Sequence, residues 1–120
     1  MAIRLQHVNI RTSDLQGTID FYTKVIGLKL GERPDFDFAG AWLYDDMQPA
    51  VHLREVAEGS QQTGNTVDHF AFHVDALDVA VAHLDKLGVS YRGPRYLPGT
   101  SLRQCFLQDP NGVIVELQGP

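Results

Sequence analysis

Hydrophobic and polar residues alternate along the stretch VDHFAFHVD, residues 67–75. Successive side chains of a β-strand point to opposite faces, so His69 and His73 share one face and the two phenylalanines share the other. The alternation predicts a strand over about residues 67–74, with one polar and one apolar face. A similar pattern near the start of the chain predicts a strand over about residues 3–11.

Each of these two strands is followed by a segment with the periodicity of an amphipathic helix. Apolar residues recur at spacings of three and four, which places them in one buried stripe. Residues that favour the helix N-cap precede each stripe, and a glycine suited to a left-handed C-cap follows it. The stripes are Leu15, Ile19, Tyr22 and Val25, then Leu77, Val81, Leu84 and Leu87; the N-cap candidates are Ser13, Asp14 and Asp75, and the C-cap glycines are Gly27 and Gly88.

Three more strands are predicted after each helix. The sequence QDPNGV is typical of a tight hairpin, because Pro110 fixes φ and Gly112 accepts a positive φ. The order of elements is βαβββ, twice, which is an α+β fold. The further strands are expected at about residues 28–33, 40–45 and 50–55, then at about 89–95, 101–108 and 113–118.

The second half of the chain repeats the first at low sequence identity, which is the signature of two copies of one structural unit. An offset of 62 residues aligns His7 with His69, and an offset of 64 aligns Trp42 with Phe106. We therefore interpret the chain as two modules. Module 1 spans about residues 1–55, a polar linker spans about 56–66, and module 2 spans about 67–120.

Composition limits the class of protein. The chain has 120 residues, 43% of them hydrophobic and 21% charged, which fits one compact globular domain. A net charge of −5, without a run of lysine or arginine, argues against binding to nucleic acid or to an anionic membrane surface. The single cysteine, Cys105, cannot form an intramolecular disulfide, and the first residues do not resemble a signal peptide. We expect a cytoplasmic protein.

The polar faces of the predicted strands carry candidate metal ligands. His7 and His69 are equivalent in the repeat, as are His52 and Glu116, and all four lie on the face away from the helices. A single strand histidine is more often a hydrogen-bonded structural residue than a ligand, but packing does not require this repeated set. If the two polar faces curve toward each other, three imidazoles and one carboxylate form a site for Zn, Ni, Co, Mn or Fe.

Other polar residues near these candidates are suited to substrate binding. Asn9, Arg11 and Arg54 share the polar face of module 1 and could hold a carboxylate or a phosphate on a substrate. His73 has no histidine counterpart in module 1, so we expect it to orient a ligand or to contact the substrate.

The chain resembles the vicinal oxygen chelate superfamily. The resemblance lies in the paired modules, in the stretches SDLQGTIDFYTKVIGLKL and DPNGVIVEL, and in the residues His7, His69 and Glu116. This superfamily includes glyoxalase I, methylmalonyl-CoA epimerase, extradiol dioxygenases, fosfomycin-resistance transferases and bleomycin-binding proteins. The resemblance implies a curved, cup-shaped mixed sheet with the helices on its outer face. It also implies metal ligation by these three residues, and a homodimer with its sites at the subunit interface.

The resemblance places His52 at a fourth ligand position, where glyoxalase I has glutamate and the epimerase has glutamine. Four ligands on an octahedral ion leave two positions, enough for two adjacent substrate oxygens. We therefore expect a metal-dependent lyase or isomerase of glyoxalase type, which acts on a small substrate with vicinal oxygens. Glu116 is then the base that takes the carbon-bound proton.

Three alternatives remain open. An extradiol dioxygenase using Fe(II) needs two open coordination positions for the catecholate and a third for O2. His52 as a fourth protein ligand would occupy the third position, which counts against this alternative. Resemblance to a fosfomycin-type thiol transferase would call for a tyrosine where this sequence has Phe106, and for a potassium-binding loop, which we do not find in the sequence. A metal-free drug-binding protein usually lacks the ligands.

Overall fold

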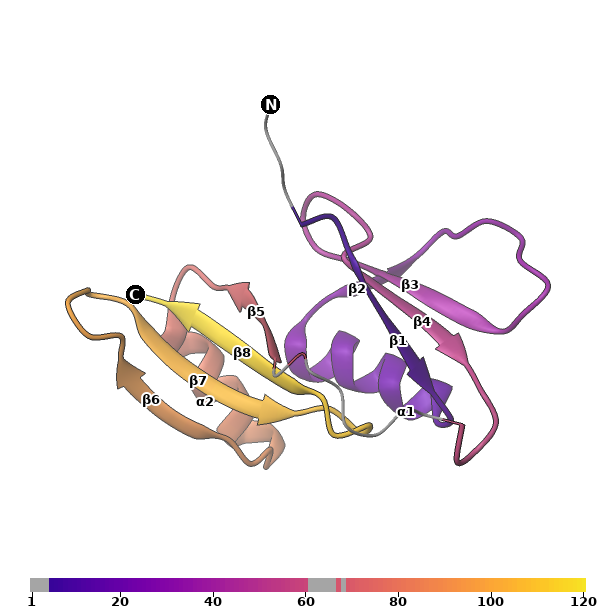
Figure 1. Cartoon of the computed structure of the whole chain (residues 1–120). Coiled ribbons are helices and arrows are strands. Elements are labelled where there is room, and N and C mark those ends of the chain that lie inside the picture. The colour runs from indigo at the N-terminus through magenta and orange to yellow at the C-terminus, as the bar shows by residue number, and fades with distance from the viewer. Residues whose placement is uncertain (1–4, 61–66, 68) are drawn as a thin grey trace. The chain divides into compact units, whose positions relative to one another are not determined.

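The computed structural model of the chain describes residues 5–60, 67 and 69–120, and it divides into two compact units, residues 1–64 and 65–120 (Figure 1). Part of the predicted linker, together with residues 3, 4 and 68 of the predicted strands, lies outside the described residues. Within the described part, no helix is long and apolar enough to span a membrane.

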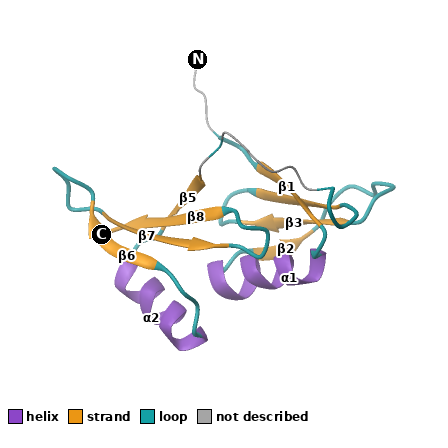
Figure 2. Cartoon of the chain, turned by 60° about the horizontal axis from the view of Figure 1, so that its bottom comes forward, coloured by secondary structure: helices purple, strands orange, loops and turns teal. Residues whose placement is uncertain are grey.

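Unit 1 has the predicted order βαβββ. Its sheet has the strand order β1-β4-β3-β2, in which β1 runs parallel to β4 and the other pairs are antiparallel. The helical segment covers one face of this sheet (Figure 2). The elements are β1 (Val8–Thr12), α1 (Leu15–Asp20), η1 (Phe21–Ile26), β2 (Lys29–Gly31), β3 (Gly40–Tyr44) and β4 (Val51–Glu55).

Unit 2 repeats this order, so the prediction of an α+β fold from tandem βαβββ modules is confirmed. Its sheet has the order β5-β8-β7-β6, again with one parallel pair, β5 with β8. A single helix covers one face (Figure 2). The elements are β5 (His69–His73), α2 (Leu77–Leu87), β6 (Arg92–Tyr96), β7 (Arg103–Gln108) and β8 (Ile114–Gly119).

The strand registers reproduce the repeat that the sequence predicts. Trp42 lies opposite His52 in the β3–β4 pair, and Phe106 lies opposite Glu116 in the β7–β8 pair. The parallel pairs β1–β4 and β5–β8 also share one register when the offsets of 62 and 64 residues are applied. Residues that align in the two halves therefore occupy equivalent places in their sheets.

The first helix begins and ends where predicted but changes type midway. Asp14 caps it, with its Oδ1 accepting a hydrogen bond from the Gly17 amide at 3.0 Å, and Gly27 ends it at a φ of 98°. The second half, η1, is a π-helix, in which Gly27 donates to the carbonyl of Tyr22 five residues earlier at 3.1 Å. Hydrophobic periodicity does not distinguish this local widening from an α-helix.

Other predictions about the element ends were wrong. Ala76, and not Asp75, is the N-cap of α2, and it makes no side-chain cap hydrogen bond; the exposed Asp75 carboxylate lies 3.7 Å from Nε2 of His73. Leu87, predicted to be buried, is 45% exposed in the last position before the C-cap. The first strand begins at Val8, because its partner strand starts opposite that residue.

The core of each unit lies between its sheet and its helix. Every second strand residue points into this layer, which leaves the other sheet face for polar side chains. Cys105 belongs to the core, as predicted for a small apolar filler, and burial raises the pKa of its thiol. Fully buried side chains include Tyr22, Leu43 and Val51 in unit 1, and Leu77, Leu84, Cys105 and Val115 in unit 2.

Candidate metal-binding and catalytic site

The polar face of unit 1 brings His7 and His52 together. The His52 ring is sandwiched between the His7 ring, with centroids 3.9 Å apart, and the indole of Trp42, with centroids 4.1 Å apart. Both pairs of planes are within 10° of parallel. Trp42 reaches this position because β3 places it directly opposite His52, and His7 reaches it from the residue just before β1. Both faces of the His52 ring are covered, and only its edge remains for ligand contacts.

The environment of His52 favours a neutral ring. Burial lowers its pKa, the nearby His7 lowers it further, and a hydrogen bond to the backbone of Pro49 opposes these effects. Proline offers only a carbonyl, so a ring N–H of His52 must donate this bond. Nε2 is buried and has no hydrogen-bond partner among the described residues. The proton therefore resides on Nδ1 and the lone pair on Nε2, which is the form that binds metals.

His7 has the same tautomer but a less suitable orientation. Its Nδ1 donates to Oε1 of Gln6, since an amide oxygen only accepts, and this leaves the lone pair on Nε2. Its ring is parallel to that of His52 at 3.9 Å. Two in-plane lone pairs on parallel rings cannot both point at one ion, because a metal–nitrogen bond is only about 2.1 Å long.

The polar face of unit 2 brings His69 and Glu116 together. His69 Nε2 lies 3.1 Å from Glu116 Oε1, and Glu116 is only 4% exposed. Two ligand atoms at this separation, each about 2.1 Å from one ion, subtend an angle of about 95°. That angle fits two adjacent positions of an octahedron, so both atoms could bind one ion with little movement of either side chain.

Two neighbours hold the pair in unit 2. Gln104 donates from Nε2 to Glu116 Oε2 at 3.3 Å, which leaves Oε1 directed at His69. The Phe106 ring meets the His69 ring edge-on, with centroids 5.7 Å apart. The carboxylate is therefore buried and oriented, and one of its oxygens faces the imidazole.

Each unit thus supplies two donor side chains. Across the described residues, no three His, Cys, Asp or Glu side chains gather into a group that could hold a metal ion. The four predicted ligands lie as two pairs, His7 with His52 and His69 with Glu116, which we call half-sites, and metal binding by them stays a prediction.

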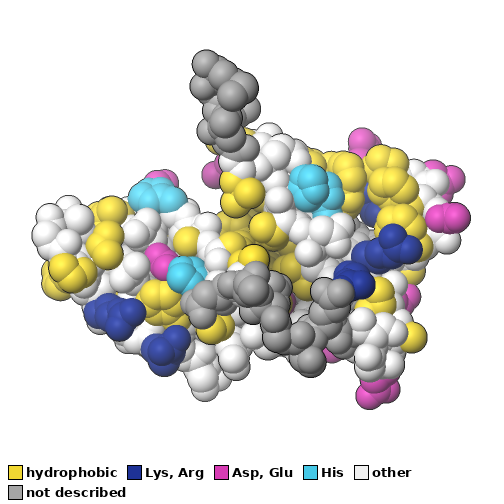
Figure 3. Space-filling model, in the orientation of Figure 1, with side chains coloured by type: hydrophobic (Ala, Val, Ile, Leu, Met, Phe, Trp, Pro, Cys, Tyr) yellow, Lys and Arg dark blue, Asp and Glu magenta, His cyan; other side chains and the backbone are white. Residues whose placement is uncertain are grey.

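The substrate-binding candidates of unit 1 lie beside its half-site. Asn9 is opposite His52, and Arg11 is opposite Arg54 in the β1–β4 register. The Arg54 guanidinium carbon lies 4.2 Å from the centroid of the Phe38 ring. Figure 3 shows histidine (cyan) and basic (dark blue) side chains exposed on the surface of unit 1. The role of these residues in binding an anionic group stays a prediction.

His73 contacts a different partner from the other candidates. Its Nε2 lies 3.7 Å from Asp75 Oδ1, and both side chains are mostly exposed. Such an exposed pair contributes little to stability. The structure places His73 on the same strand face as His69, at the other end of β5.

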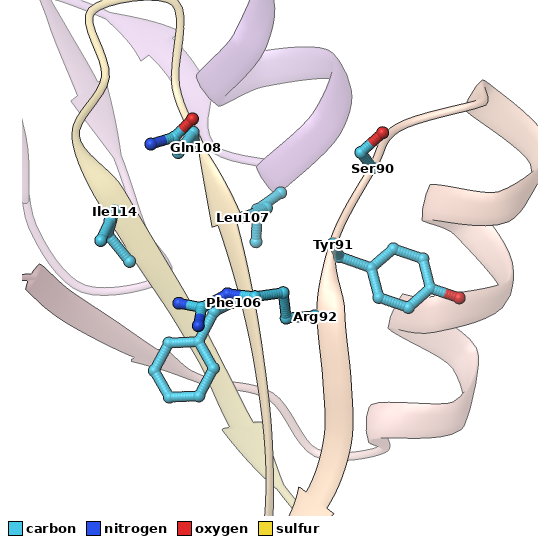
Figure 4. Close-up of a pocket in the computed structure, with 7 residues that line it drawn as sticks. All are labelled: Ser90, Tyr91, Arg92, Phe106, Leu107, Gln108 and Ile114. Carbon is cyan, nitrogen blue, oxygen red and sulfur yellow. The ribbon is translucent and has the colours of Figure 1, made fainter.

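A surface pocket of about 360 Å³ opens in unit 2 next to Phe106 (Figure 4). Phe106 forms part of its wall and also contacts His69, so the pocket adjoins the half-site of unit 2. The guanidinium carbons of Arg92 and Arg95 lie 5.5 and 5.3 Å from the centroid of the Phe106 ring. The lining residues are Ser90, Tyr91, Arg92, Phe106, Leu107, Gln108 and Ile114.

The sequence pattern alone does not predict the places of Trp42, Phe106 and Gln104 at the site. The alignment of the two halves pairs Trp42 with Phe106, and each lies opposite a predicted ligand. The strand register was therefore the signal that could have identified these two aromatic residues. Gln104 has no polar counterpart in unit 1, where the aligned residue is Gly40, so the repeat gives no indication of its role.

Comparison with known proteins identifies related sequences over nearly the whole chain. The sequence model of the Glyoxalase/Bleomycin resistance protein/Dioxygenase superfamily matches residues 4–117. Lactoylglutathione lyase of Escherichia coli O157:H7 is 30% identical over 125 residues, covering 96% of this chain and 91% of the relative. Glyoxylase I 4 of Arabidopsis thaliana is 28% identical over 120 residues, covering 94% of this chain and 68% of the relative.

A solved structure has the same fold. The crystal structure of TnmS3, an antibiotic binding protein from Streptomyces sp. CB03234, superposes with a TM-score of 0.76. The two sequences are 24% identical, and the match covers 100% of this chain and 98% of TnmS3. At this level of identity the likeness extends to the fold alone.

Proposed function

Because the chain belongs to the Glyoxalase/Bleomycin resistance protein/Dioxygenase superfamily, we propose that it is a metal-dependent lyase or isomerase of glyoxalase type. Its membership confirms the resemblance inferred from the sequence, and relatives named lactoylglutathione lyase support a glyoxalase-type enzyme. The proposed substrate is a small molecule with two adjacent oxygens.

The observation that carries this proposal is the pair of half-sites at equivalent positions of the repeat. His52 has a buried Nε2 lone pair without a partner among the described residues, which is costly unless a ligand binds it. His69 and Glu116 already have the spacing of two neighbouring ligands. Three neutral imidazoles and one carboxylate suit Zn, Ni, Co, Mn or Fe better than Ca or Mg. The residues present therefore fit a divalent transition metal.

The proposed site is completed when both half-sites face one ion, either within one chain or across a homodimer. A bound divalent ion would act there as a Lewis acid toward the oxygens of the substrate. In this proposal Glu116 takes the carbon-bound proton, because its carboxylate is buried beside the pocket and Gln104 fixes one of its oxygens. Asn9, Arg11, Arg54 and His73 are proposed to orient the substrate.

Metal binding is the first test of the proposal. Calorimetry with metal-free protein should show one ion per set of four ligands, with a dissociation constant below about 10 μM. His52→Ala and His69→Ala should each weaken binding by about 10-fold or more. His83→Ala is the matched control, because His83 is an exposed histidine on α2 and outside both half-sites. Absence of binding for all of the named ions would refute the metal site and favour a binding protein.

The reaction class is tested with a small panel of substrates. Hemithioacetals, 2-methylmalonyl-type thioesters and catechols should be assayed with and without O2, and the proposal expects O2-independent turnover of one of the first two. If His52→Ala keeps its metal and the protein cleaves a catechol only with O2, the enzyme is an extradiol dioxygenase. Light scattering at micromolar concentration distinguishes the homodimer from a site that closes within one chain.

A further inference from the structure

We propose that Trp42 is a positioning residue that fixes the plane of the His52 ring for metal binding, while His7 leaves the stack to become a ligand. The inference rests on the proposed metal site. It assigns different roles to the two aromatic rings that cover His52 in this structure.

Two contacts together determine how His52 is oriented. The hydrogen bond from Nδ1 to the Pro49 backbone leaves Nε2 as the nitrogen that can bind an ion. The Trp42 indole, 4.1 Å away and within 10° of parallel, restricts rotation of the ring plane. A histidine side chain has two rotatable bonds, so these two restraints leave its Nε2 in one direction. An imidazole that is already oriented loses less conformational entropy when it binds an ion.

The two rings of the stack differ in how firmly they are held. Trp42 is partly buried within β3 and opposite His52 in a regular antiparallel register, with Phe36 beside it at a centroid distance of 6.4 Å. His7 is exposed and precedes β1, and it contacts Gln6 and His52 itself. His7 can therefore turn at little cost, whereas turning Trp42 would break its ring contacts with both His52 and Phe36.

The geometry requires that His7 moves if it is to bind the same ion as His52. In the stack, the His7 and His52 ring centroids are 3.9 Å apart, and an ion bound to both would lie far out of each ring plane. Rotation of His7 exposes one face of His52 but leaves the Trp42 contact intact. Metal binding should therefore convert a stack of three rings into a stack of two.

The equivalent contact in unit 2 has a different geometry. Phe106 aligns with Trp42, yet it meets the His69 ring at 88° and lies opposite a carboxylate, Glu116. A carboxylate has no ring face to stack on. Parallel stacking on this aromatic residue is thus found in unit 1, where β4 carries a histidine at the opposite position. This argues for a role of Trp42 that is specific to His52.

The first experiment compares metal affinities by calorimetry. Trp42→Leu keeps an apolar side chain without an aromatic face, and it should weaken binding of Zn or Ni by about 10-fold, the effect typical of a residue that orients a ligand. Trp42→Phe should stay within about 3-fold of the natural protein. Leu43→Val is the control, because Leu43 lies on the same strand but faces the core. Urea unfolding of each metal-free variant separates a loss of stability from a loss of affinity.

The outcomes distinguish this inference from the proposed function. If the natural protein binds metal and Trp42→Leu binds equally well, the positioning role is refuted and the metal site stands. An equal loss of affinity in Leu43→Val and Trp42→Leu also refutes it, because general destabilisation would then explain both. If the natural protein binds no metal, the proposed function and this inference are both refuted.

The second experiment follows the rings directly. Trp42 is the only tryptophan in the chain, so its fluorescence reports on this site alone. Binding of Co or Ni should quench its emission and saturate at the stoichiometry found by calorimetry, and Ca should have no effect. In NMR spectra of the diamagnetic Zn form, ring contacts between His7 and His52 should disappear and those between Trp42 and His52 should persist. A persisting His7 contact, or a lost Trp42 contact, would overturn the proposed exchange.

Discussion

The substitution Glu116→Gln tests whether one side chain is both a metal ligand and the base. Glutamine has almost the shape of glutamate and keeps an oxygen that can bind a metal, but it has no negative charge and cannot take a proton at neutral pH. The contact from Gln104 to Oε2, at 3.3 Å, can survive if the Gln104 amide flips. The oxygen that faces His69 Nε2 at 3.1 Å would remain in place. The variant therefore removes charge and basicity with little change of packing.

Glu116→Gln should reduce metal affinity and turnover by different factors. Loss of the ligand charge should weaken metal binding by about 10-fold, which is the lower end of the effects seen around metal sites. At a metal concentration about 100 times the original dissociation constant, the linked stabilisation would fall from about 2.7 to about 1.4 kcal/mol. For a chain of this size that change lowers the metal-induced rise in Tm by about half. Loss of the base should lower turnover by about 10² to 10⁴, which raises the barrier by about 2.7 to 5.5 kcal/mol.

Circular dichroism melts with and without metal measure the first loss, and turnover at saturating metal measures the second. Gln118→Ala is a suitable control, because this residue lies on the same face of β8 two positions away. Turnover equal to that of the natural protein, with full metal occupancy, would show that Glu116 is not the base. A complete loss of the metal-induced shift would show that an amide cannot replace the carboxylate as a ligand, and the two roles would then be inseparable by this variant.

Three further predictions concern stability and reactivity. Asp14→Ala should lower the free energy of unfolding by about 1 kcal/mol in a urea titration, because it removes the cap of the first helix; Asp75→Ala, which caps nothing, should change it by less than about 0.5 kcal/mol. Gly40→Ala should cost about 1–3 kcal/mol in the same assay, because a Cβ there would lie 2.3 Å from the carbonyl oxygen of Leu53. Cys105 should resist a thiol-specific disulfide reagent in the native state and react after unfolding, since burial raises its pKa and keeps it in the unreactive thiol form below that pKa; fast native labelling would contradict this.

The fold was predictable because the signals for it are local and occur twice. Alternating strands, amphipathic stripes and the glycines at 27 and 88 each depend on a few neighbouring residues, and the repeat provides a check on each element. The failures lie in local backbone and side-chain geometry, which the hydrophobic pattern does not encode. In the π-helical η1 the buried residues are Phe21 and Tyr22, whereas Val25 of the predicted stripe is only half-buried, and the hydrophobic spacing did not indicate this change. Asp75 has the chemistry of an N-cap, yet the cap position falls one residue later, at Ala76, and the Asp75 carboxylate is exposed near His73, two residues earlier in the chain.

The candidate site was predictable only to the level of residue type and strand face. Parity along the strands places the four proposed ligands on the polar faces, and the structure pairs them as two half-sites. Parity does not determine ring orientation, so the stacking of His52 between His7 and Trp42 was not foreseen. The contact from Gln104 to Glu116 depends on side-chain rotamers on two neighbouring strands, which no sequence period encodes.

The two half-sites contain different ligands, so they should have different roles in the proposed reaction. Unit 1 contributes two imidazoles, and burial lowers the pKa of His52, so this half would supply nitrogen ligands but offers no carboxylate base. Unit 2 contributes the single carboxylate, Glu116, next to a pocket lined by Arg92 and Phe106. A divalent ion held by three neutral imidazoles and one carboxylate keeps a net positive charge, which favours oxygen atoms that gain negative charge when a proton leaves. Proton transfer should therefore take place on the side of unit 2, and unit 1 should determine mainly how tightly the ion is held.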